Sequence, residues 1–136
     1  MGKAKTISYL KVTVDDRPGT LLSVAEKLKS KNLGLLALKG QAGASGQGDI
    51  YLFPKKAEKA ANALQKAGLS FEEGSCFLMK GTDATGALVK PLNALAAAGV
   101  NLRAIEAVAV GGKYATLFWF APEDTDRAAA ALSAKK

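Results

Sequence analysis

Apolar residues near the start of the chain follow two different periods. Over residues 10–14, leucine and valine alternate with lysine and threonine, and this period of two predicts a strand with one buried face. From Leu21 to Leu28 the apolar positions recur at helical spacing, which predicts a helix with one apolar stripe. Pro18 suits the first turn of that helix, because its fixed φ angle is helical and its missing N–H is not needed there.

The first half continues with further strand and helix patterns. Asn32 and Gly34 favour a helix end between them, because both residue types tolerate the left-handed conformation. Gly68 is the expected stop of a second helix that points Ala57, Ala60, Ala61 and Leu64 inward. The expected strands are residues 35–39, residues 49–53 and the run "LSFEEGS".

The second half repeats this order. We expect a strand at "CFLMKG", a helix over about 85–98, strands at 102–110 and 114–120, and a last helix over 126–133. Gly111 and Gly112 offer the positive φ angles of a tight hairpin. Pro91 removes a backbone donor inside the predicted helix, so we expect a kink there or a helix that starts late.

An internal repeat sets the domain organisation. Asp16, Gly19 and Leu22 recur at constant spacing as Asp83, Gly86 and Val89, and the correspondence continues through the following helix and strand. We therefore predict two units joined almost without a linker, residues 1–74 and residues 75–136.

The order strand, helix, strand, strand, helix, strand is that of an α+β, ferredoxin-like βαββαβ unit, in which the helices cover one face of an antiparallel sheet. Many unrelated proteins share this order, so it does not identify a function.

Composition places the chain among globular proteins. It has 136 residues, of which 49% are apolar and 23% charged, and no apolar run approaches the roughly 20 residues that span a bilayer. The N-terminal residues lead into an alternating pattern and lack the continuous apolar stretch of a secretion signal. We expect a cytoplasmic protein without a membrane association.

Several kinds of chemistry lack their usual residues. The sequence has no histidine and one cysteine, Cys76, which lies in an apolar run typical of a buried strand. The run "GASGQG" (43–48) lacks the strand-then-helix context of a phosphate-binding loop and is interpreted as a loop between strands. We expect no catalytic residues, no metal and no cofactor.

The formal net charge of +7 raises the question of nucleic-acid binding. The lysines are scattered, and no block of like charge exceeds two in a row. RNA-recognition modules share the strand and helix order, but "DIYLFP" and "KYATLFWF" do not fit their aromatic motif. Nucleic-acid binding is therefore ranked well behind other functions.

Three stretches carry a family resemblance. "VDDRPGTLLSVAEKL" resembles the first strand, loop and helix of an ACT domain, a small regulatory module that binds amino acids, and "AAAGVNLRAIEAV" resembles the passage from its first helix to its second strand. Residues from "GLSFEEGS" to "LFWF" resemble the junction and second half of a tandem ACT protein. The resemblance implies two units side by side, joined into one eight-stranded antiparallel sheet, with ligands at the seam.

Physical chemistry at the first loop is compatible with ligand binding. A helix N-terminus leaves backbone N–H groups unpaired and favours a carboxylate. Gly19 would permit close approach, and Asp16 would either receive an ammonium group or cap the helix. A helix cap with a tight turn is the alternative interpretation of the whole stretch.

The resemblance also implies site residues. One pocket wall would be Asp16, Arg17, Pro18, Gly19, Thr20 and Leu21, and Asn101 would reach it from the second unit, unless Asn101 only ends a helix. The weaker counterpart site would comprise Asp83, Thr85, Gly86, Leu88 and Gly34. We expect one functional and one degenerate site.

Trp119 and Leu117 should lie on the sheet face away from the helices, where a large apolar surface would serve a homodimer. The preferred function is a non-catalytic regulatory protein that binds a free amino acid. The alternatives are a regulatory subunit that acts mainly through contact with a partner enzyme and, ranked lower, an RNA-binding module.

Overall fold

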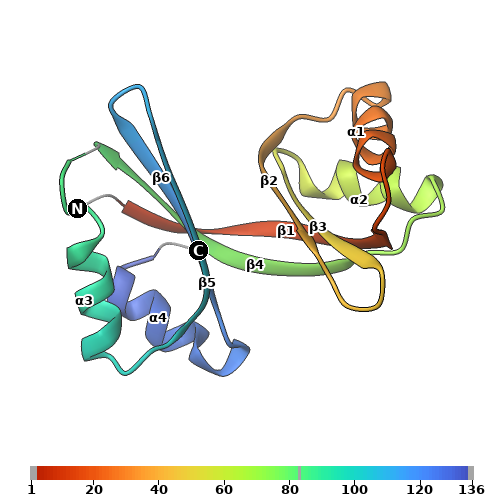
Figure 1. Cartoon of the computed structure of the whole chain (residues 1–136). Coiled ribbons are helices and arrows are strands. Elements are labelled where there is room, and N and C mark those ends of the chain that lie inside the picture. Colours follow the sequence, from red (N-terminus) through yellow and green to blue (C-terminus); the bar gives the residue numbers. More distant parts are fainter. Residues whose placement is uncertain (1–2, 83, 135–136) are drawn as a thin grey trace. The chain divides into compact units, whose positions relative to one another are not determined.

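The computed structural model describes residues 3–82 and 84–134. In chain order its elements are β1 (Lys3–Asp15), α1 (Thr20–Ser30), β2 (Leu35–Ala42), β3 (Gln47–Pro54), α2 (Ala57–Lys66), β4 (Glu72–Thr82), α3 (Val89–Ala97), β5 (Leu102–Val110), β6 (Lys113–Phe120), the short 3₁₀ helix η1 (Pro122–Asp124) and α4 (Thr125–Leu132) (Figure 1). This is the predicted α+β order of two βαββαβ-like units.

The chain divides into two compact units. Unit A is Ser8–Ser75, and unit B combines the described residues up to Ile7 with those from Cys76 onward. The first residues of β1 therefore belong to unit B, while the rest of the strand belongs to unit A. In the same way β4 contributes its first residues to unit A and its remainder to unit B.

The described strands form a six-stranded sheet in the order β2-β3-β1-β4-β6-β5, so the predicted eight strands are wrong. The runs "LSFEEGS" and "CFLMKG" were counted as two strands, but Glu72–Thr82 is one continuous strand. The eighth strand was implied by the family resemblance alone, since the sequence pattern predicted no strand after the last helix. In unit B its place in the strand order is taken by the first residues of β1.

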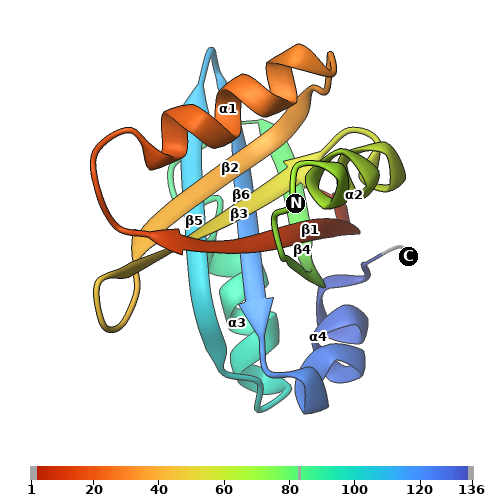
Figure 2. The same ribbon diagram turned by 90° about the vertical axis from the view of Figure 1, so that its right-hand side faces the viewer.

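The core of unit A lies between one face of its strands and two helices (Figures 1 and 2). The antiparallel register pairs Leu10 with Leu52 and Val12 with Ile50, which places all four side chains on the face covered by α1 and α2. The helices contribute the apolar positions that the sequence predicted: Val24, Leu28, Ala60 and Leu64.

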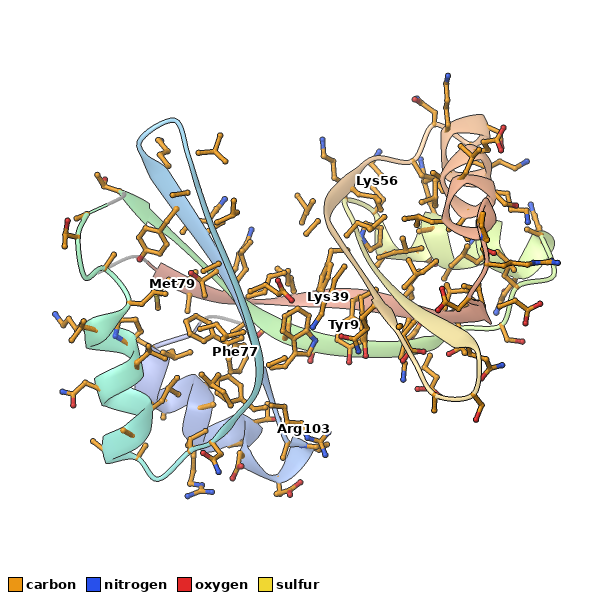
Figure 3. The ribbon with its side chains drawn as sticks, viewed as in Figure 1. Tyr9, Lys39, Lys56, Phe77, Met79 and Arg103 are labelled. Atoms are coloured by element: carbon orange, nitrogen blue, oxygen red, sulfur yellow. The ribbon has the colours of Figure 1, made fainter. Side chains whose placement is uncertain are left out.

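The core of unit B is built in the same way. Met79 and Phe77 of β4, labelled in Figure 3, pack with Leu95 of α3 and Leu132 of α4. Ala4, at the start of β1, belongs to this cluster and is 2% exposed. Each fully buried leucine of such a core contributes on the order of 2 kcal/mol through removal of its surface from water.

Turn and capping residues behave as their chemistry predicts. Gly111 and Gly112 adopt φ angles of 59° and 79° between β5 and β6, which confirms the predicted hairpin. Gly68 follows α2 with a φ of 76°. The helix expected from residue 85 begins only at Val89, which places Pro91 in the first turn where no N–H is needed and confirms the late start.

Candidate functional site

The loop between β1 and α1 is fixed by backbone hydrogen bonds. The N–H of Asp16 donates to the carbonyl oxygen of Gly46 at 2.9 Å, and the N–H of Arg17 donates to that of Asp15 at 3.0 Å. The first of these bonds ties the loop to the turn between β2 and β3. Pro18 lies in a turn before the helix, so its predicted place inside the first helical turn is wrong.

Gly19 occupies the N-cap position of α1 with a φ of 89°, a left-handed conformation that only glycine adopts without strain. This backbone reversal explains why the helix begins at Thr20 and not at Pro18. The hydroxyl of Thr20 donates to the carbonyl oxygen of Arg17 at 3.0 Å, which holds the turn against the helix.

The head of α1 is not capped by a side chain. Among the described residues no side chain makes an N-cap hydrogen bond to α1, so Asp16 does not act as the helix cap. The N–H of Thr20 donates to the carbonyl oxygen of Arg17 at 3.3 Å, whereas the amides of Leu21 and Leu22 have no intrahelical acceptor and lie at the positive end of the helix dipole. The head of α1 therefore keeps its capacity to bind an anionic group.

A hollow of about 310 Å³ opens beside this loop. We call it the unit A hollow. Its lining comes from three segments: Val14, Asp15, Asp16, Arg17, Thr20 and Leu21 from the end of β1 and the start of α1; Gly40, Gln41 and Ala42 from β2; Gly48, Asp49 and Ile50 from β3.

Four of the predicted site residues line the unit A hollow: Asp16, Arg17, Thr20 and Leu21. Pro18 and Gly19 shape the adjoining turn but do not line it. Asn101 belongs to unit B, where it is exposed immediately before β5. Its part in ligand binding stays a prediction.

The sequence interpretation missed the wall that β2 and β3 supply. Antiparallel pairing brings Gly48 of β3 opposite Val14 of β1, and Asp49 opposite Gln41 of β2. The alternating patterns predicted these strands. They did not predict the strand register, which depends on residues far apart in the sequence and brings the strand ends next to the loop.

The unit A hollow combines charge of both signs with an apolar floor. Asp16 supplies a carboxylate from the loop, and Arg17 supplies a guanidinium group. The side chains of Asp15 and Asp49 project from the other face of the strands, because Val14 and Ile50 take the helix-covered face. One oxygen of Asp49 accepts a hydrogen bond from the Thr13 hydroxyl at 3.0 Å. Carboxylates suit an ammonium group, and a guanidinium beside an open helix head suits a carboxylate.

Among the described residues, unit B has one hollow at the corresponding loop and another on the opposite face of its sheet. The first, about 520 Å³, is lined by Gly81, Thr82, Ala84, Gly86, Ala87, Lys90 and Tyr114, and we call it the helix-side hollow. The second, about 490 Å³, is lined by Lys80, Gly81, Thr82, Val108, Val110, Lys113, Tyr114 and Ala115, and we call it the edge-side hollow.

The residues of the predicted weaker site come from both units, and the site stays a prediction. Gly86 lines the helix-side hollow, but Thr85 and Leu88 do not. Gly34 belongs to unit A, where the aliphatic chain of Lys55 lies against it and its carbonyl oxygen accepts the N–H of Lys55 at 3.0 Å. Asp83 lies outside the described residues.

Leu117 and Trp119 do not provide the exposed apolar surface that was expected. The register places them on the other face of β6 from Phe118, as predicted, but each is only 9% exposed. Cys76 is 4% exposed, which agrees with a buried strand cysteine. In the part of the chain that the structure describes, no helix is both long enough and apolar enough to cross a membrane.

Comparison with known proteins identifies the fold. No family model and no curated protein matches the sequence. Among solved structures, protein BT0572 from Bacteroides thetaiotaomicron is similar with a TM-score of 0.84 and 23% identity, over 96% of this chain and 88% of that one. The ligand-free regulatory subunit of aspartate kinase from Thermus thermophilus is similar with a TM-score of 0.64 and 16% identity, over 95% and 91%.

The regulatory subunit of aspartate kinase from Thermus flavus is similar to the same extent, with a TM-score of 0.61 and 16% identity over 98% of this chain and 95% of that one. These structures are tandem ACT-domain modules, and the chain has their fold. At such identities the likeness concerns the fold alone.

Proposed function

We propose that the protein is a non-catalytic regulatory module that binds a free amino acid in the unit A hollow. The observation that carries this proposal is the head of α1, uncapped by any side chain, beside a hollow lined by the loop residues Asp16 and Arg17. The α-carboxylate would lie at the helix head and Arg17, and the ammonium group would lie at the Asp16 carboxylate.

The apolar floor gives the ligand's side chain a place. Val14 and Ile50 are apolar lining residues from neighbouring strands, and Leu21 adds an apolar side chain from the first turn of α1. A hollow that is apolar over most of its floor and polar at a few convergent points is the usual form of a small-molecule site.

The regulatory part of the proposal is supported by the fold. Two of the similar structures are regulatory subunits of aspartate kinase, which are separate chains of about this length. By analogy, ligand occupancy would shift the association of this chain with a partner enzyme or with a second copy of itself. Sedimentation of the protein with and without its amino acid tests self-association directly.

Nucleic-acid binding stays the lower-ranked alternative for a structural reason. On the helix-free face of unit A, the ammonium groups of Lys11 and Lys39 lie 5.9 and 5.8 Å from the centroid of the Tyr51 ring. Tyr9, labelled in Figure 3, stands edge-on to the same ring at 5.3 Å. The protein's own side chains therefore engage the ring that a base would need as a stacking platform.

Thermal-shift screening against the twenty amino acids tests the proposed function. A ligand present at about 100 times its dissociation constant raises the free energy of unfolding by about 2.7 kcal/mol. We expect one amino acid or one chemical group of them to raise the melting temperature. A flat response to all twenty, with a shift produced by single-stranded RNA, would reverse the ranking.

Calorimetric titration of the active amino acid then locates the site. Replacement of Arg17 by alanine should weaken binding at least tenfold. Arg103, an exposed arginine of unit B, provides the charge-matched control, and Arg103→Ala should bind as the wild type does. Equal losses from both variants would show that only net charge matters.

A further inference from the structure

Two glycines in the strands that line the unit A hollow are not required by the fold. We propose that Gly40 and Gly48 keep a space open for the ligand's side chain, so that the hollow selects amino acids whose side chains are apolar and larger than a methyl group. This inference rests on the proposed function and adds which amino acids bind and which residue limits their size.

Glycine is unfavourable inside a strand. It loses more conformational freedom on folding than any other residue, and it has no side chain to pack. The described strands contain four glycines: Gly40 in β2, Gly48 in β3, and Gly74 and Gly81 in β4. None of the four has a positive φ angle, so the backbone conformation does not explain them.

Tyrosine rings explain the two glycines of β4. A Cβ atom on Gly74 would lie 2.4 Å from Cζ of Tyr9, and a Cβ atom on Gly81 would lie 2.6 Å from Cε1 of Tyr114. Any larger residue at either position would displace a ring. The fold therefore requires glycine at both.

Among the described residues, no such neighbour explains Gly40 and Gly48. A Cβ atom on Gly40 would meet no atom within 4 Å, and one on Gly48 would meet the carbonyl oxygen of Gln41 at 3.5 Å and Cβ of Asp16 at 3.9 Å, which are ordinary contacts. The irregular register at the start of β2 does not reach Gly40. A strand glycine that neither bends the strand nor packs beneath a neighbour is typical of a place where a ligand comes close to the backbone.

The strand registers place both glycines on the helix-covered face of unit A. Gly40 pairs with Ile50, a core residue of that face, and Gly48 pairs with Val14 of β1 and with Ala42 of β2. All five residues line the unit A hollow. Three of them carry at most a methyl group, so the surface is recessed at these positions.

The side chains that border the two glycines are apolar. Val14 and Ile50 come from the strands, and Leu21 comes from the first turn of α1. The charged loop residues Asp16 and Arg17 would be occupied by the ligand's own ammonium and carboxylate groups. A further charge on the ligand's side chain would lose hydration without gaining a partner, whereas an apolar side chain gains with each methylene that leaves water.

The two glycines lie at different distances from the charged loop. Gly48 belongs to β3, and its Cβ position is 3.9 Å from Cβ of Asp16. Gly40 belongs to the edge strand β2, which is one strand farther from β1 and the loop. A ligand held by the loop would therefore place its first side-chain atoms over Gly48, and only a longer side chain would reach Gly40.

Calorimetric titration of the wild type with alanine, leucine, norleucine and lysine tests the selectivity. We expect leucine to bind at least tenfold more tightly than alanine. Norleucine has the lysine side chain without its ammonium group, and we expect it to bind at least tenfold more tightly than lysine. Tightest binding of a charged amino acid would overturn this inference and leave the proposed function intact, whereas a wild type that binds none of the twenty amino acids would refute both.

Gly40→Val tests the size limit. A valine side chain would fill the space over position 40, so leucine should bind at least tenfold more weakly to the variant than to the wild type. Alanine reaches only Gly48 and should keep its affinity within threefold. An equal loss for both ligands would overturn the inference, as would unchanged binding of leucine.

Ala107→Val in unit B is the matched control. Ala107 corresponds to Gly40 at the constant spacing of the repeat, lies exposed on the edge strand β5 and lines neither of the two hollows described for unit B. The control adds a valine in a similar setting and should bind leucine within threefold of the wild type. A tenfold loss in this variant too would show that the effect does not come from the unit A hollow.

Urea denaturation of Gly40→Val without ligand provides a second readout. Because no atom lies within 4 Å of the Cβ position and valine favours strands, the free energy of unfolding should be unchanged or higher than that of the wild type. A lower free energy of unfolding, or a variant that does not fold, would show that the fold itself requires this glycine and would overturn the inference.

Discussion

The ring of Tyr9 in β1 lies directly over Gly74 in β4. A Cβ atom on Gly74 would come within 2.4 Å of both Cζ and Oη of that ring, closer than any real side chain tolerates. The same ring stands edge-on to Tyr51 at 5.3 Å and to Phe53 at 5.6 Å. Gly74 is therefore a packing requirement of an aromatic cluster and not a turn or hinge.

Gly74→Ala should lower the free energy of unfolding by about 1–3 kcal/mol, because the added methyl group forces the Tyr9 ring out of place. Urea denaturation measures the loss. Gly40→Ala is the matched control, since a Cβ atom there would meet nothing within 4 Å.

In a double-mutant cycle, Tyr9→Ala should remove most of the cost of Gly74→Ala, because the obstructing ring is gone. Strictly additive losses would contradict the contact.

Thr116→Val should raise the free energy of unfolding by about 1 kcal/mol or more. The Thr116 hydroxyl is fully buried and has no hydrogen-bond partner among the described residues, so its desolvation is uncompensated. Valine has nearly the same shape and removes the polar atom. The control Thr116→Ser keeps the hydroxyl and loses a methyl group, so it should be less stable than the wild type. If Thr116→Val is also less stable than the wild type, the hydroxyl makes a hydrogen bond in solution and the prediction is wrong.

Asp16→Ala separates a structural role from ligand binding. The Asp16 side chain makes no cap hydrogen bond to α1, so the free energy of unfolding should change by less than about 0.5 kcal/mol. The proposed function predicts an affinity loss of at least tenfold for the amino acid. Unchanged affinity together with a stability loss of about 1 kcal/mol would restore the interpretation of Asp16 as a helix cap.

Gly19→Ala should cost about 1–2 kcal/mol of stability through the backbone alone. The φ of 89° is unfavourable for any residue with a Cβ atom, and no atom lies within 4 Å of the Cβ position. Gly19→Asn should cost less, since asparagine tolerates the left-handed region better than alanine does. Equal stability of Gly19→Ala and the wild type in urea denaturation would contradict the conformation of this turn.

Local sequence signals predicted most of the elements. Gly111 and Gly112 predicted a hairpin, because few other residues adopt two successive positive φ angles. Pro91 predicted a helix that starts late, because a proline ring is not tolerated in the middle of a helix. The helix was expected to include Pro18 but begins at Thr20, because the left-handed conformation of Gly19 between them is not visible in the apolar pattern.

Long-range relationships were the part that the pattern could not predict. An extended run looks the same whether it serves one unit or two, so the pattern divided the single strand Glu72–Thr82 into two. The family resemblance raised the expected number to eight, whereas the described residues form a six-stranded sheet. Arg17 and Thr20 were found through the loop that contains them, whereas Gln41 and Gly48 reach the same hollow only through strand pairing. The position of the Tyr114 ring over Gly81 depends on a strand register that no local signal specifies.

The assignment of the first residues of β1 to unit B has a consequence for how the chain folds during synthesis. Every residue of unit A has been made once Ser75 is added, so that unit can fold while the remainder is still being translated. Ala4, by contrast, must wait for partners such as Leu132 that are made last. Contacts between the two ends of the chain raise the contact order of unit B. Because folding slows as contact order rises, we expect unit B to be the slower-folding half of the molecule.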